Sequence, residues 1–195
     1  MALLPVNGPE NSVAEIRKWM KEHGLSQTGK GSGVTPEINV PHRVFHANLQ
    51  DILDDESLEK AYPTGWRYFH VDENGRLCAV EIRFGADGEE HVLNEVNFGT
   101  VVDEQRQLIE DIKDRPELDN KEHALLRLGF LKIKAAWFRG KTRQEDFYCP
   151  VSPCFYGLIA GKLYSSAEFL PIVVKVAKET PNPLVNIPTD DLLGG

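Results

Sequence analysis

The most definite pattern of apolar and polar positions in this chain surrounds Asn74-Gly75. Residues 66–72 and 76–84 on either side are rich in aromatic and β-branched side chains, which favours β-strands. An Asn-Gly pair tolerates the positive φ angles of a two-residue type I′ turn. The sequence therefore predicts a β-hairpin here, followed by a third strand that ends near residue 98.

Counting residue pairs from the predicted turn assigns the side chains of the hairpin to two faces. The apolar face is the predicted core and contains Phe69, Val71, Cys78 and Val80. The opposite face is predicted to contact a partner or a ligand and contains Trp66, Tyr68, Glu81 and Arg83. Trp and Tyr offer a large contact area at a small entropic cost, which suits a binding surface. The alternative is an ordinary solvent-exposed sheet face.

The register of the third strand stays open at this point. One loop length places Glu81 opposite Asn94, and a loop one residue longer places it opposite Glu95. Two carboxylates in contact would raise the pKa of one of them, as general acid–base catalysis can require, but they would also repel each other. A small-molecule enzyme that uses the polar face of residues 66–98 is therefore one functional hypothesis.

Helical spacing of apolar residues predicts two amphipathic helices. Ser12 and Glu15 form a capping-box pattern, and the apolar positions that follow predict a helix over 13–23. Residues 102–114 combine alternating charges with apolar side chains, which predicts a second helix. A short helix is expected at residues 43–53.

Residues 120–139 form a dense apolar segment between a predicted N-cap at Asp119 and a predicted C-cap at Gly140. We expect a long and largely buried helix here, although the alternation in residues 130–134 leaves a pair of strands as the alternative. Three later segments are predicted to be strands, namely residues 145–151, 155–163 and 172–177.

These elements predict an α+β fold in which an antiparallel sheet packs against two or three helices, with extended N- and C-terminal arms. The predicted organisation has three parts: residues 1–65 as an N-terminal arm with the capped helix 13–23 and a proline-containing linker, residues 66–179 as the α+β core domain, and residues 180–195 as an extended C-terminal tail. Terminal segments with few core signals are ordered only where something holds them, either their own domain or a neighbouring subunit.

Composition places the chain among folded proteins. Hydrophobic residues make up 41% of the 195 residues, which suffices for a core. The sequence contains neither an apolar run of about 20 residues, as a membrane span needs, nor a secretory signal pattern at the N-terminus. Its 3 cysteines do not form a disulfide framework. We therefore expect a cytoplasmic protein, or one incorporated in an intracellularly assembled particle, that has no membrane partner.

The net charge of −8 disfavours general binding to nucleic acid, but the charge is unevenly distributed. Residues 124–144 contain six basic side chains and no acidic one, and aromatic rings lie among them. Single-strand binders combine such rings with cations along a groove. The alternative functional hypothesis is therefore a single-stranded nucleic-acid-binding site made of Lys132, Lys134, Trp137, Arg139, Lys141 and Arg143. The rings would equally suit the core of a buried segment.

Cysteine and histidine pairs invite comparison with a zinc site. Cys149 and Cys154 bracket four residues, and His42 and His46 are four residues apart. A Cys-x₄-Cys spacing with two prolines is unusual for zinc, so we expect ordinary buried cysteines and surface histidines instead. No metal, cofactor or catalytic residue is assigned.

Because no catalytic pattern in the sequence is specific, the favoured hypothesis is non-catalytic. The chain is expected to be a protein–protein interaction or structural subunit of a larger assembly, such as a virion or a multisubunit complex. Its expected partners are other protein subunits, in a homo-oligomer or a hetero-complex.

Overall fold

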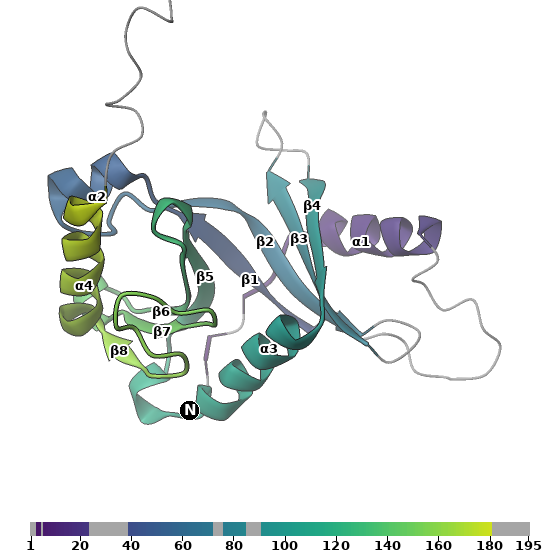
Figure 1. The fold of residues 1–195 in the computed structure, drawn as a ribbon. Helices are drawn as coiled ribbons and strands as arrows, with labels where there is room; N and C mark the ends of the chain where they lie inside the picture. The colour runs from purple at the N-terminus through teal and green to yellow at the C-terminus, as the bar shows by residue number, and fades with distance from the viewer. Residues whose placement is uncertain (1–2, 5, 24–38, 72–75, 85–90, 181–195) are drawn as a thin grey trace, which may run out of the picture.

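The computed structural model of the chain describes residues 3–4, 6–23, 39–71, 76–84 and 91–180 (Figure 1). Within these residues the chain forms one mixed eight-stranded β-sheet and four α-helices. The strands are β1 (Asn39–His46), β2 (Tyr62–Val71), β3 (Leu77–Phe84), β4 (His91–Phe98), β5 (Glu122–Leu128), β6 (Ile133–Arg139), β7 (Phe147–Pro150) and β8 (Tyr164–Ser165). The α-helices are α1 (Glu10–Glu22), α2 (Leu49–Asp55), α3 (Thr100–Ile112) and α4 (Ser166–Glu179), and short 3₁₀ helices lie at Pro116–Leu118, Gly129–Leu131 and Arg143–Glu145.

The strands follow the order β4-β3-β2-β1-β5-β6-β7-β8 across the sheet. All neighbours are antiparallel except β1 and β5, which run parallel. The prediction of a sheet with helices against it is confirmed, but the sheet is mixed rather than antiparallel. Because residues 39–46 form a central strand, the boundary predicted at residue 65 does not separate an arm from the sheet. Residues 181–195 of the predicted tail lie outside the described residues.

The predicted three-stranded unit is present as β2, β3 and β4. Its two predicted turns fall on residues 72–75 and 85–88, which lie outside the described residues. The hairpin register differs from the prediction by one residue, because Tyr68 pairs with Val80 and Arg67 with Glu81. A shift of one residue moves a side chain from one face of a strand pair to the other. The predicted apolar and polar faces are therefore both wrong in composition.

Helices cover both faces of the sheet. The strands therefore carry apolar residues on both sides and lack a regular alternation of apolar and polar positions. On the face that we call the α3 face, Phe69 and Ala79 pack against Val102 of α3. On the opposite face, α1 contributes Ile16 and Met20 to a cluster with strands β2 and β3. Farther along that face, α2 and α4 lie together at one end of the molecule, over β1, β5, β6 and β7 (Figure 1).

Two of the predicted helices are confirmed, with shifted boundaries. Helix α1 begins at Glu10, earlier than the predicted start at residue 13, so that Ser12 lies inside the helix and is buried. Helix α3 covers residues 100–112, close to the predicted 102–114. The segment 43–53 instead contains the end of β1 and the start of α2.

Three apolar segments were assigned to the wrong structure. Residues 120–139 form β5 and β6 rather than a long helix, so the alternative of two strands is correct. Both strands are covered on both sides, and buried strands lack the polar alternation that distinguishes them from buried helices. Residues 172–177 belong to α4, which begins with a capping box at Ser165 and Glu168. Residues 155–163 form a loop between β7 and β8.

Replacing Gly65 with alanine is expected to destabilise the fold. A Cβ atom on Gly65 would overlap the Ile82 carbonyl oxygen and lie 2.8 Å from the Cα atom of Arg83, both in the backbone of β3. Because backbone cannot move away without opening the β2–β3 pair, we expect the free energy of unfolding to fall by about 1–3 kcal/mol in urea titrations. The control is Gly129→Ala, which meets no atom within 4 Å and should change stability by less than about 0.5 kcal/mol. Equal stability of the two variants would contradict this packing.

Candidate functional site

The four residues predicted to share a contact face are separated in the structure. Trp66 and Tyr68 are buried in the cluster beneath α1. Glu81 lies on the α3 face, where it is also buried, and Arg83 is exposed. The one-residue difference in register accounts for this separation, because it places each aromatic residue opposite an apolar residue of β3.

The α3 face contains a group of four charged side chains, which we call the charged cluster: Arg67, Glu81, Glu95 and Arg127. Arg67 and Glu81 are the most buried of them, each with only 3% of its surface exposed, and the Arg67 guanidinium lies 3.5 Å from Glu81 Oε2. The Arg67 guanidinium also donates hydrogen bonds to the side-chain oxygens of Asn97, at 3.2 Å, and Gln105, at 3.1 Å. Gln105 belongs to α3, so this helix is tied to the sheet through the cluster.

Arg127 joins the two carboxylates of the charged cluster. Its Nη2 atom lies 2.6 Å from Glu81 Oε2 and 3.2 Å from Glu95 Oε2. Glu81 and Glu95 are direct neighbours across the β3–β4 pair, which settles the register that the sequence left open. Two opposed carboxylates would repel each other, and the arginines between them remove that repulsion.

The electrostatics of the charged cluster favour fixed ion pairs over proton transfer. Hydrogen bonding from Asn97, and then the charge of Arg127, lowers the pKa of Glu95, so this carboxylate stays ionised at neutral pH. Burial lowers the pKa of Arg67, but a guanidinium remains protonated in proteins. Burial also lowers the pKa of Lys134, which lies near the cluster. A carboxylate held in this way can accept hydrogen bonds but is a poor general acid.

The basic residues proposed for nucleic-acid binding do not form one surface. Lys134 lies opposite Arg127 in the β5–β6 strand pair and is on the α3 face. Trp137 points to the opposite face and is fully buried. The Trp137 indole donates a 2.9 Å hydrogen bond to Asp146 Oδ2, and the guanidinium of Arg139 lies over its ring. Arg143 is paired with Asp146, while Lys132 and Lys141 are exposed. Because side chains alternate between the two faces of a strand, the basic and aromatic residues of this segment lie on opposite faces of the sheet and not on one surface of a helix.

The cysteines and histidines compared with a zinc site lie in packed surroundings. The ring of His42 lies 4.5 Å from the ring of His123, which stacks in turn on Phe138. Cys149 is buried, and burial raises the pKa of its thiol to about 12. Among the residues that the structure describes, no three His, Cys, Asp or Glu side chains are grouped to hold a metal ion.

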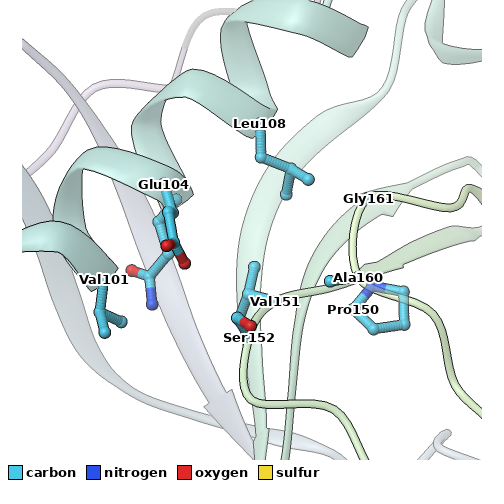
Figure 2. Close-up of a pocket in the computed structure, with 9 residues that line it drawn as sticks. Val101, Glu104, Leu108, Pro150, Val151, Ser152, Ala160 and Gly161 are labelled. Carbon is cyan, nitrogen blue, oxygen red and sulfur yellow. The ribbon is translucent and has the colours of Figure 1, made fainter.

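An exposed apolar surface lies elsewhere, on the loop 151–163 between β7 and β8, which we call the aromatic loop. Three large side chains on it are exposed: Phe155 at 43%, Tyr156 at 49% and Ile159 at 60%. Beside this loop is a cavity of about 330 Å³, where Val101, Glu104 and Leu108 of α3 face Val151 and Ala160 (Figure 2). The exposed surface thus continues from the loop to α3.

Hydrogen bonds and one buried side chain hold the aromatic loop in place. Leu158 is buried in the hydrophobic cluster that α2 and α4 form with β1, β5, β6 and β7, which we call the main core. The Tyr164 hydroxyl accepts the Ile159 N–H at 3.1 Å, and the Gly161 N–H donates to the Pro150 carbonyl, also at 3.1 Å. Sequence reasoning missed this surface because residues 155–163 were assigned to a strand. The available signal was Gly157 and Gly161, both at φ +78°, a conformation that favours glycine and interrupts a strand.

Comparisons with known proteins add no functional information. No protein-family model matches the chain, and searches of curated proteins and of solved structures returned no significant match. Within the described ranges, no helix combines the length and the apolar character that crossing a membrane requires.

Replacing Glu81 with glutamine is expected to be strongly destabilising. The substitution leaves the buried Arg67 guanidinium without its carboxylate, and breaking a buried pair of this kind costs about 3–5 kcal/mol. The measurement is the free energy of unfolding in guanidinium chloride. The control is Asp55→Asn, which removes the same charge from an exposed pair with Lys60, at 2.9 Å, and should leave the unfolding midpoint unchanged. If both variants unfold at the wild-type midpoint, the charged cluster does not stabilise the fold.

Acidification is expected to destabilise the protein through His123. Burial lowers the pKa of His123 from its ordinary 6.5 to about 4, so between these values the unfolded chain binds a proton that the folded chain does not. Stability contributed by neutral His123 is complete above the unfolded pKa and decreases as the pH falls towards 4. We expect the wild type to lose about 3 kcal/mol relative to His123→Phe between neutral pH and pH 4, measured by urea titration. Parallel pH profiles of the two proteins would contradict this.

Proposed function

We propose that the chain is a non-catalytic protein-interaction subunit of a larger assembly, and that the aromatic loop is its contact surface. The observation that carries the proposal is the exposure of Phe155, Tyr156 and Ile159 on a loop that is anchored in the core. Single exposed apolar residues are normal in proteins, but a group of large ones on one fixed segment is typical of a contact site.

The chemistry of the aromatic loop suits a protein partner. Tyr and other aromatic residues are enriched where interfaces gain most of their binding energy. The adjoining cavity has mostly apolar walls and a few polar groups, including the side chains of Glu104 and Gln105. A partner side chain can fill such a cavity while the exposed rings pack around it.

The charged cluster supports a catalytic function less well. Its carboxylates are engaged by Arg67 and Arg127, and its polar groups are held by hydrogen bonds to neighbouring side chains. The single-strand-binding hypothesis is weakened in a different way. It required Trp137 to be available for stacking, and this ring is inside the main core.

Site-specific photo-crosslinking tests the proposed contact surface. A photoreactive phenylalanine analogue in place of Tyr156 should form a covalent adduct with another polypeptide when the protein is irradiated in the cells that produce it. Adding Phe155→Ser and Ile159→Ser should reduce the yield at least about tenfold, because these residues supply apolar contact area.

The matched control uses the exposed Val92 of β4. The same photoreactive group in place of Val92 should give a low yield of adduct. The substitution Val92→Ser, added to the protein with the photoreactive group at position 156, should leave the yield at that position unchanged. Absence of any polypeptide adduct at Tyr156, in a variant that folds as the wild type by circular dichroism, would refute the proposed function.

A further inference from the structure

Charges of opposite sign lie at the two ends of the segment 155–160 of the aromatic loop. At one end, Lys132 and Lys134 line a small hollow together with Phe155. At the other end, Glu104 of α3 lines the larger cavity together with Ala160 and Val101 (Figure 2). Phe155 and Ala160 both belong to the aromatic loop, so the exposed apolar side chains lie between a basic side and an acidic side.

The two hollows adjoin each other. Both are lined by Pro150 and Val151, two buried residues where the aromatic loop begins. Lys132 and Glu104 are exposed, and within the described part of the chain neither forms a salt bridge. Their charges are therefore available to a molecule that covers the loop.

A surface with an apolar centre and opposite charges on its two sides is complementary to a copy of itself. We propose that the partner of the aromatic loop is a second copy of this chain, related by a two-fold axis that passes through the loop. This inference rests on the proposed function and names its partner. In such a dimer each contact occurs twice, since the same patch is used by both copies.

The two-fold axis defines which groups meet. It brings Phe155, Tyr156 and Ile159 of the two copies together at the centre. It also places Lys132 of each copy beside Glu104 of the other, giving two identical ion pairs at the rim. The apolar centre supplies most of the affinity, and the rim charges select the orientation.

Charge exchange between two variants tests this arrangement directly. In purified Lys132→Glu, each rim pair becomes two carboxylates, and in purified Glu104→Lys, each becomes two ammonium groups. Both variants should dimerise about tenfold more weakly than the wild type in sedimentation equilibrium at low salt. An equimolar mixture of the two should recover wild-type affinity, because every rim pair in the mixed dimer joins opposite charges.

The double variant Lys132→Glu/Glu104→Lys should recover the affinity as well, since it exchanges the two signs within each copy. High salt should reduce the differences among all these proteins, because exposed ion pairs are screened. Ile159→Ser should give a monomer at concentrations where the wild type is dimeric, and Val92→Ser should remain dimeric.

The outcomes distinguish the inference from the proposed function. A wild-type protein that stays monomeric at every concentration, or single variants that are not rescued by mixing, overturns the two-fold dimer. If the Tyr156 crosslink then joins a different polypeptide, the proposed function stands and only the identity of the partner is wrong. If the purified protein is monomeric and Tyr156 forms no adduct, both fail.

Discussion

The structure depends on β1, the strand that joins the two parts of the sheet. It pairs antiparallel with β2 and parallel with β5, so residues far apart in the chain share one hydrogen-bonded layer. In a flat sheet, β3 and β5 would be about 14 Å apart, because β2 and β1 lie between them at about 4.8 Å per strand. The 2.6 Å contact between Glu81 and Arg127 spans this separation because both side chains are long and reach towards each other over β2 and β1.

The covering of both faces of the sheet affects where a partner can bind. Helices and the charged cluster occupy the faces of the sheet, and the aromatic rings that alternate along β2 become part of the core. The proposed contact surface lies instead at the margin of the sheet. The β7–β8 connection is such a place, because Leu158 anchors it in the core while its neighbours remain exposed.

Local signals in the sequence were sufficient for some elements and misleading for others. The strands on either side of Asn74-Gly75 and the amphipathic helices α1 and α3 follow from residue preferences and from periodicity, which act over a few residues. Residues 120–139 could not be assigned in this way, because strands buried on both faces have the continuous apolar character of a buried helix. The sequence predicted Glu81 as a contact residue, whereas it is buried, and Glu95 was one of its two predicted neighbours. Their pairing with Arg67 and Arg127 depends on strand order, which no local pattern specifies.

The fixed position of the aromatic loop has a consequence for the entropy of the proposed association. Side chains that must be ordered upon binding cost about 0.5–1.5 kcal/mol each, and flexible loops add to this cost. Here the backbone of the loop is already restrained by the Tyr164 hydroxyl, by the Pro150 carbonyl and by the burial of Leu158. For the proposed association, the loop is thus ordered before it binds, which lowers the entropic cost of binding. In the proposed complex, a substitution that loosened Leu158 would weaken association without altering any residue at the contact.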